Sequence, residues 1–205
     1  MTIFLTADRS AASTLRRLFP MPHPLGAPPL APRFRRAVLA DVPSIVALVE
    51  RAYRGDASRA GWTTEADLLG GRRTSEDEVR ELVLGTATRM VLAEDGATGT
   101  LLGTMLVEDE GEHAYVGMLS VEPTLQAGGV GKALLREAER IAERELGRAR
   151  LRMTVIEQRP ELLSYYARRG YAPTGATEPF PYGDESFGAP KRDDLRFLVL
   201  EKRLG

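Results

Sequence analysis

Apolar positions recur at two spacings along the chain, and these spacings predict its helices and strands. After a short strand that begins near residue 33, helical spacing predicts a first helix with Asp41 as its N-cap. The apolar stripe of that helix consists of Val42, Ile45, Val46, Val49 and Tyr53. Ser75 and Glu78 have the spacing of a capping box, and they predict a second helix over residues 76–85.

Strands and helices alternate over the middle and the C-terminal part of the chain. Residues 89–109 are typical of two strands joined by a turn, and residues 113–123 of a third strand. A glycine-rich turn leads into a helix from about Gly129 to Leu146, with Gly147 as its C-cap. A strand (149–157), a short helix (159–171) and, after a loop, a last strand (194–204) complete the series. This order predicts an α/β (α+β) domain around one mixed sheet.

The ends of the chain differ in composition. Among 205 residues, residues 1–36 hold six arginines against one acidic residue, and residues 19–32 are rich in proline. Proline at this density excludes a helix or a central strand. We therefore expect a poorly ordered Pro/Arg-rich N-terminal extension over 1–32 and a single domain over 33–205. A basic arm that touches nucleic acid or membrane is the alternative for the extension.

Composition excludes several classes of chemistry. The chain has no cysteine and only two histidines, which rules out disulfides and cysteine-type zinc sites, and we predict no metal centre. The net charge of −1 argues against a nucleic-acid partner. No apolar run approaches the roughly 18 residues of a membrane span, and we expect no membrane partner. A cytoplasmic protein is the simplest interpretation.

The turn before the long helix carries the candidate chemistry. Gln126 stands where a Walker loop needs its first glycine, and Leu134 where a dinucleotide fingerprint needs its third, so neither motif fits. What remains is Gly129 and Gly131 at the start of a helix, followed by Lys132. Glycine has no Cβ, so a ligand can approach the backbone closely, and the first N–H groups of the helix have no partner within it. Both features favour a bound pyrophosphate at this turn. The alternative is a tight turn that only lets helix and sheet pack closely.

Two segments match a known family. The run GMLSVEPTLQAGGVGKALL (117–135) resembles the acetyl-CoA signature of the GCN5-related N-acetyltransferases, the GNAT superfamily, and SYYARRGYAPTG (164–175) resembles its second signature. The resemblance implies a mixed, mostly antiparallel sheet, splayed between two strands and flanked by helices on both faces. It also implies acetyl-CoA as co-substrate and direct transfer of an acetyl group to a primary amine of a small molecule or protein.

The family's functional residues transfer onto this chain by motif. The resemblance implies that the backbone of Leu119, Ser120 and Val121 pairs with pantetheine, and that Tyr166 protonates the departing thiolate. The expected pyrophosphate cradle is Gln126, Ala127, Gly128, Gly129, Val130, Gly131 and Lys132. A free tyrosine has a pKa of about 10 and a thiol a pKa of about 8.5. The tyrosine is therefore protonated at neutral pH and can donate its proton as the thiolate leaves. The alternative for Tyr166 is a core aromatic residue.

The chain departs from the family pattern at two places. Ala127 stands where the family often has glycine, and Gly128 where it often has a basic or polar residue. Arg159 begins the last helix where asparagine is frequent, which puts a contact to pantetheine in doubt.

The acceptor side is less defined. An amine with a pKa of about 10.4 must lose a proton before it attacks the thioester. His113, Tyr115 and Glu157 are candidates for the general base that accepts this proton. We leave the general base unassigned. Two long connectors offer an acidic and aromatic lining that would suit a cationic amine: Trp62, Glu65, Asp67, Phe180, Tyr182, Asp184, Glu185 and Phe187. The alternative is that these acids cap helices or face solvent.

Other functions and assemblies stay open at this point. A CoA-binding sensor or scaffold of the same fold, without catalysis, is the first alternative to the enzyme. An interaction module with a nucleic-acid-binding tail is the second. A homodimer is an open possibility for the assembly.

Overall fold

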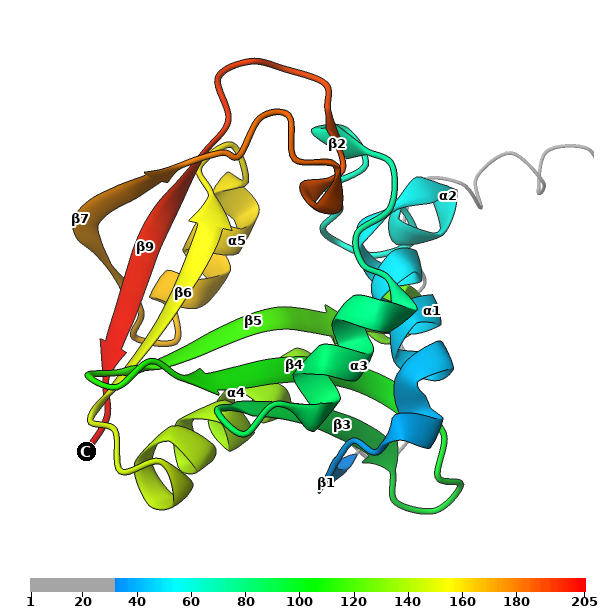
Figure 1. Cartoon of the computed structure of the whole chain (residues 1–205), viewed down its shortest axis with the longest axis vertical. Helices are drawn as coiled ribbons and strands as arrows, with labels where there is room; N and C mark the ends of the chain where they lie inside the picture. The colour runs from blue at the N-terminus through cyan, green and yellow to red at the C-terminus, as the bar shows by residue number, and fades with distance from the viewer. Residues whose placement is uncertain (1–31) are drawn as a thin grey trace, which may run out of the picture.

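A computed structural model of the protein describes residues 32–205, and their centre is a seven-stranded sheet (Figure 1). In order across the sheet its strands are β1 (Pro32–Arg36), β3 (Thr88–Asp95), β4 (Leu101–Asp109), β5 (Ala114–Val121), β6 (Arg150–Ile156), β9 (Arg196–Arg203) and β7 (Ala172–Pro179). Every neighbouring pair is antiparallel except β5 and β6, which are parallel. A second, two-stranded sheet joins β2 (Leu69–Gly70) to β8 (Ala189–Pro190). The mixed, mostly antiparallel sheet predicted by the resemblance is confirmed.

The sheet opens between β5 and β6. These strands pair only where Ala114 faces Leu151 and Tyr115 faces Arg152, and beyond that point they diverge (Figure 1). From residue 116 onward, that edge of β5 therefore has no strand partner within residues 32–205. Unpaired backbone N–H and C=O groups on such an edge need other partners. The splay thus creates a place where an extended ligand can pair with β5.

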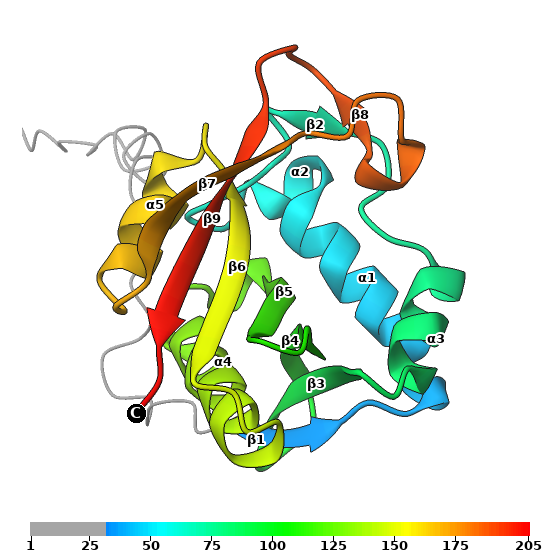
Figure 2. The same ribbon diagram turned by 60° about the vertical axis from the view of Figure 1, so that its left-hand side comes forward.

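Helices cover both faces of the sheet (Figures 1 and 2). On one face, α1 (Val42–Tyr53) and α3 (Glu76–Leu84) enclose a core that includes Ile45, Val79 and Leu92. On the other face, α4 (Val130–Arg140) and α5 (Pro160–Ala167) share a larger core with the inner side chains of β4, β5 and β6. A four-residue helix, α2 (Gly55–Ser58), follows α1 directly. Within residues 32–205, none of the helices combines the length and the apolar character that crossing a membrane requires.

Three local predictions need correction. Asp41 does precede α1, but its carboxylate accepts hydrogen bonds from Arg35 and from the Val38 N–H instead of capping α1. The regular part of the long helix ends at Arg140 and continues as a π-helical turn, Ile141–Glu145. Ser75 caps α3 as expected and accepts from the Glu78 N–H, whereas the Glu78 carboxylate accepts from Thr74.

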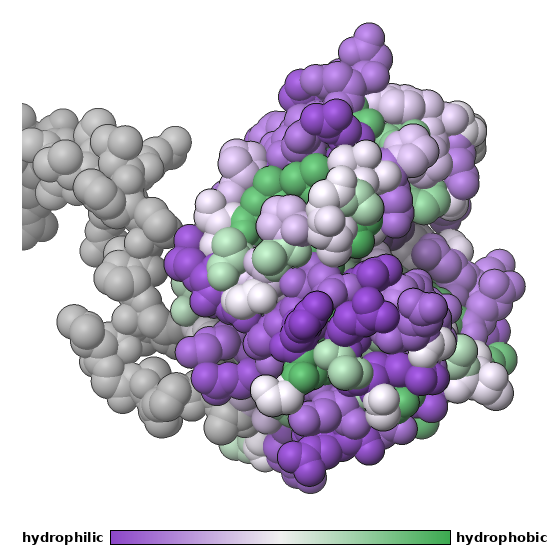
Figure 3. All heavy atoms as spheres, turned by 90° about the vertical axis from the view of Figure 1, so that its left-hand side faces the viewer, coloured by the Kyte–Doolittle hydropathy of each residue, from purple (hydrophilic) through white to green (hydrophobic). Residues whose placement is uncertain are grey.

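Strand β7 was not predicted, because its sequence APTGATEP has the proline and glycine content of a loop. It lies at the edge of the sheet, where one side of the backbone needs no strand partner, and all eight of its residues are exposed. Hydrophilic side chains cover much of the surface on this side of the molecule (Figure 3). The predicted N-terminal extension lies outside the described residues, except for Pro32, which begins β1.

Candidate active site

The turn between β5 and α4 has the backbone of an anion-binding site. Gly129 is the N-cap of α4 with a φ of 90°, and no side chain caps this end of the helix. The N–H groups of the first helical turn have no partner within the helix, and the helix dipole makes this end positive. A Cβ built on Gly129 would meet no atom within 4 Å, so the space beside the turn is open. The turn therefore fits the pyrophosphate that its sequence predicts.

A cavity of about 280 Å³, which we call the outer cavity, begins at this turn. Its walls are Ala52, Tyr53, Trp62, Thr63, Leu119, Val121, Gln126, Ala127, Gly129, Gly131, Lys132, Arg159, Leu162, Tyr165, Tyr166 and Arg169. The guanidinium carbon of Arg169 lies 3.4 Å from the centroid of the Tyr165 ring. The buried Nε of Arg169 has no hydrogen-bond partner within residues 32–205. Together with Lys132, Arg169 gives the outer cavity a positive end that suits a polyphosphate.

The segment 61–65 forms one wall of the outer cavity. The Trp62 N–H donates to the side-chain oxygen of Gln126 at 3.1 Å, and the Trp62 ring lies 5.2 Å from the Tyr165 ring. A Cβ on Gly61 would lie 2.2 Å from the same Gln126 oxygen, so a side chain at position 61 would displace the Gln126 amide from this contact. Trp62, which we predicted on the acceptor side, thus lies beside the expected cofactor turn.

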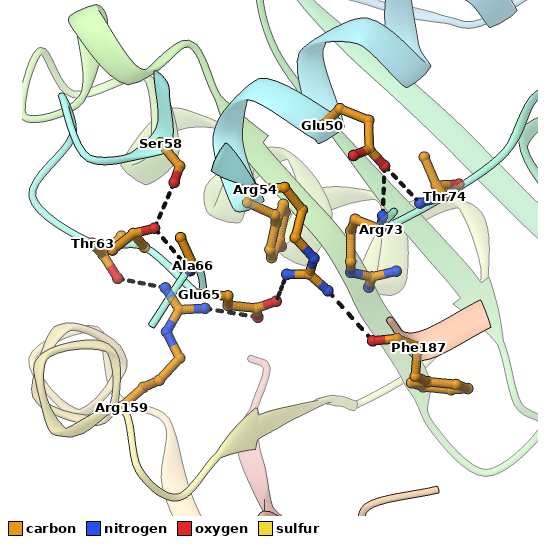
Figure 4. Close-up of polar contacts among 12 residues, drawn as sticks. Glu50, Arg54, Ser58, Thr63, Glu65, Ala66, Arg73, Thr74, Arg159 and Phe187 are labelled. Carbon is orange, nitrogen blue, oxygen red and sulfur yellow. Dashed lines mark hydrogen bonds and ion pairs between the residues drawn. The ribbon is translucent and has the colours of Figure 1, made fainter. Parts of the chain in front are cut away.

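Glu65 lies at the centre of a buried ion-pair network (Figure 4). Its carboxylate accepts from Arg54 at 2.6 Å and from Arg159 at 2.8 Å. Arg159 also donates to Thr63, which in turn donates to Glu161. The network links α1, the segment 61–65 and the start of α5. Because two guanidinium groups neutralise the Glu65 carboxylate, this residue does not provide a free acid for a cationic amine.

A second cavity of about 140 Å³, the inner cavity, continues from the outer one. The two share Tyr53, Leu119, Arg159, Leu162 and Tyr166. The Tyr166 side chain is buried, and its hydroxyl makes no hydrogen bond within residues 32–205. Burial raises the pKa of Tyr166 well above its usual range. A protonated hydroxyl that is free to donate thus lies where the two cavities meet.

The free edge of β5 passes the same junction. Met105 of β4 faces both Met118 and Leu119, a β-bulge in which Met118 has a φ of 49°. The Leu119 carbonyl accepts a hydrogen bond from the Tyr53 hydroxyl at 3.0 Å. Leu119 and Val121 line the outer cavity, while the Ser120 side chain turns back and donates to the Met118 carbonyl. This is the stretch in which we predicted backbone pairing with pantetheine.

The remaining predicted acceptor residues are not brought together. The Tyr115 hydroxyl is 2.8 Å from the Thr154 hydroxyl, across the gap between β5 and β6, and both residues line the inner cavity. Glu157 instead forms an exposed ion pair with Arg196. The Tyr182 hydroxyl accepts from the Leu195 N–H at 2.7 Å and donates to a carbonyl, so it holds its own loop in place.

The other candidates divide in the same way. Phe180 and Phe187 line the inner cavity. His113 lies 2.7 Å from Glu110 and lines a groove that adjoins the inner cavity, although His113 does not line the inner cavity itself. Asp67 pairs with Arg59 on the surface, and the Asp184 carboxylate caps the Ser186 N–H.

Sequence reasoning missed Arg54, Arg73 and Arg159 as residues of the inner cavity. It also assigned Tyr53 to the core stripe of α1, although its hydroxyl reaches β5. Arginine in a polar connector is the ordinary pattern of a solvent-exposed residue, so no local signal marked Arg73.

The cradle itself provides a stability test. Ala127 has a φ of 73°, a left-handed conformation that costs an L-residue with a Cβ about 1–2 kcal/mol. We expect Ala127→Gly to raise the free energy of unfolding by about 0.5–1 kcal/mol, after the larger entropy of glycine in the unfolded chain is subtracted. Urea unfolding measures this change. The control Ala133→Gly, within α4, should lower stability by about 1 kcal/mol, and the same loss in both variants would contradict the argument.

Comparison with known proteins agrees with this geometry. Residues 49–171, more than half of the chain, match the model of the Acetyltransferase (GNAT) family. Among solved structures, the chain is similar to the ribosomal-protein-S18-alanine N-acetyltransferase from Escherichia coli, with 15% identity, coverage of 85% of this chain and 95% of that chain, and a TM-score of 0.62. It is also similar to nourseothricin acetyltransferase, with 21% identity, coverage of 85% and 99%, and a TM-score of 0.59.

A third similar structure is the IAA acetyltransferase from Bacillus cereus ATCC 14579, with 17% identity, coverage of 85% and 100%, and a TM-score of 0.57. At these identities the likeness shows a shared fold. A comparison with curated proteins found no match. The family model decides the assignment: the chain belongs to the acetyltransferase (GNAT) family and is an enzyme of the N-acetyltransferase class.

Proposed function

We propose that the protein transfers an acetyl group from acetyl-CoA to the primary amine of a small molecule or protein, with Tyr166 as the general acid. The observation that carries this proposal is the meeting of two cavities at Tyr166. The outer cavity ends on a helix N-terminus beside Lys132, and the inner cavity lies on the far side of the tyrosine. One substrate can therefore enter from each side and react at the junction.

The outer cavity has the groups that acetyl-CoA needs. The N–H groups of Val130, Gly131 and Lys132 are the first of α4, and they would hold the pyrophosphate with the Lys132 ammonium. The unpaired edge of β5 would pair with the amides of pantetheine. Trp62 and Tyr165 form an aromatic wall along this path.

The available side chains support direct transfer. Bound acetyl-CoA supplies the activated acetyl group, and the chain has no cysteine that could carry it as a thioester of the protein. When the acceptor amine displaces CoA, the thiolate needs a proton, and the Tyr166 hydroxyl can donate one. Glu65 is held between two arginines, so we assign no general base and expect the amine to lose its proton to water.

Two measurements test this function. Calorimetry with acetyl-CoA measures binding to the outer cavity, and release of free thiol over a panel of amines measures transfer. We expect binding together with thiol release for at least one class of amine. Tight binding without thiol release for any amine would instead favour a CoA sensor or scaffold of the same fold.

The variant Gly129→Glu tests the position of the cradle. A carboxylate at the N-terminus of α4 would repel the phosphates and fill the open space beside the turn, so we expect the affinity for acetyl-CoA to fall by about 100-fold or more. Gly99→Glu is the matched control, because Gly99 also has a positive φ, of 72°, and open space around it, in the turn between β3 and β4. Unchanged affinity in Gly129→Glu would place the pyrophosphate elsewhere.

A further inference from the structure

The inner cavity is positively charged. Three guanidinium groups line it, those of Arg54, Arg73 and Arg159, whereas Glu65 is the one carboxylate among its described lining residues. The net charge of the wall is therefore +2. An ammonium group of the acceptor would meet repulsion here, unless the acceptor brings its own negative charge. This charge is opposite to the acidic lining that the sequence led us to expect.

Arg73 is the guanidinium with the fewest partners. Its backbone N–H donates to the Glu50 carboxylate at 2.5 Å, which holds the main chain between β2 and α3 (Figure 4). The side chain lies 5.2 Å above the Tyr53 ring and forms no ion pair or hydrogen bond with another described residue. Burial raises the pKa of Tyr115 on the opposite wall, and the positive charge of Arg73 opposes that rise.

Arg54 offers a second unfilled donor. Two of its nitrogens are engaged, one with Glu65 at 2.6 Å and the other with the Phe187 carbonyl at 3.4 Å. Its Nε is buried and has no hydrogen-bond partner within residues 32–205. Arg159, by contrast, is occupied by Glu65, Thr63 and Glu161. A buried N–H without a partner costs stability.

The rest of the inner cavity is apolar and aromatic. Leu69, Phe180, Phe187 and Phe197 line it. The rings of Phe180 and Phe197 are stacked with their centroids 5.7 Å apart, and Phe180 and Phe187 meet edge to face at 6.3 Å. Such a wall binds a hydrocarbon body and excludes water. The cavity thus combines an apolar wall with the guanidinium of Arg73, unpaired among the described residues, and the nearby charge of Arg54.

From this combination we propose that the acceptor is a primary amine that also carries a carboxylate and an apolar body, and that Arg73, assisted by Arg54, binds the carboxylate. The inference rests on the proposed function, because it names the substrate class of the same site. A guanidinium binds a carboxylate through parallel charge-assisted hydrogen bonds, which fix position as well as charge. The carboxylate also screens the ammonium form of the acceptor from the arginines.

Matched pairs of acceptors test the inference by kinetics. Each pair differs only in the carboxylate: leucine and 3-methylbutylamine, phenylalanine and 2-phenylethylamine, 5-aminopentanoate and butylamine. We expect kcat/KM for at least one acid to exceed that of its amine by about tenfold or more, and spermidine to be a poor acceptor. Equal or better rates for all the amines, or a preference for spermidine, would overturn the inference and leave the proposed function standing.

Variants of Arg73 assign the preference to one side chain. In Arg73→Gln the ratio between acid and amine should fall toward one, whereas Arg73→Lys, which keeps the charge, should retain part of it. Arg72→Gln is the control, since Arg72 is exposed and lines neither the inner nor the outer cavity. An unchanged ratio in Arg73→Gln, with an unchanged circular-dichroism spectrum and acetyl-CoA affinity, would contradict the assignment.

A binding measurement separates this inference from catalysis. N-acetylleucine and its uncharged counterpart N-(3-methylbutyl)acetamide are titrated calorimetrically into the protein with CoA present. We expect tighter binding of N-acetylleucine by about tenfold, and loss of that difference in Arg73→Gln. Binding of neither compound, or equal binding of both, would overturn the inference. Absence of thiol release with every amine would count against the proposed function alone.

Discussion

The substitution Tyr166→Phe is expected to lower kcat by about 10²-fold or more, the usual contribution of a positioned general acid. It should leave the affinity for acetyl-CoA nearly unchanged, because the ring that lines both cavities stays in place. The hydroxyl has no structural hydrogen bond to lose within residues 32–205, so the effect should be chemical and not a matter of folding. Stopped-flow or steady-state thiol release measures kcat, and calorimetry measures the affinity.

Tyr165→Phe is the matched control for this prediction. Tyr165 is the preceding residue on α5 and lines the outer cavity, but not the inner one. We expect kcat of Tyr165→Phe to stay within about threefold of the wild type, since its hydroxyl lies beside Gly131 in the cradle and not in the inner cavity. If Tyr166→Phe keeps full turnover, or if both variants lose turnover equally, Tyr166 is not the general acid.

The pH dependence supports the same test. Burial raises the pKa of Tyr166, so its acidic, donating form persists above the pH at which a free tyrosine with a pKa of about 10 would ionise. The proton donor should therefore not limit the wild-type rate on the alkaline side below about pH 10.

The turn before α4 could be predicted from local motifs, because its geometry depends only on residues that are adjacent in the sequence. The turn at Gly129 and Gly131 could be read from sequence, since the helix N-terminus that it opens is built from the same few residues. The cradle also contains an unusual feature that the sequence does not show, the left-handed conformation of Ala127. The splayed sheet followed from the resemblance to a family and not from any pattern of apolar positions.

The charge of the acceptor side was not predictable, because it depends on contacts between distant segments. Glu65 looked like a free acid in a polar connector, but its partners Arg54 and Arg159 lie 11 and 94 residues away. Arg73 looked like a surface residue, but the connector that contains it folds over the inner cavity. Only tertiary contacts change an acidic and aromatic lining into a cationic and aromatic one.

The ion pairs of Glu65 with Arg54 and Arg159 should contribute strongly to stability. Glu65→Ala is expected to lower the free energy of unfolding by about 3–5 kcal/mol, because it leaves two buried guanidinium groups without their counter-charge. Asp67→Ala is the matched control two residues further on. Asp67 is exposed and pairs with exposed Arg59, so its loss should cost far less stability than the loss of Glu65. Urea unfolding monitored by circular dichroism measures both changes.

A combined variant tells whether charge or shape stabilises this region. Replacing Glu65 with Leu together with Arg54→Met and Arg159→Met removes the buried charges and keeps the apolar volume. Buried ion pairs are often no more stabilising than well-packed hydrophobic residues, so most of the lost stability should return. Glu65→Ala should also weaken acetyl-CoA binding, because the segment 61–65 would no longer hold Trp62 against Tyr165. The combined variant should restore part of that binding. If Glu65→Ala costs no more than Asp67→Ala, the network is solvated and does not hold the segment in place.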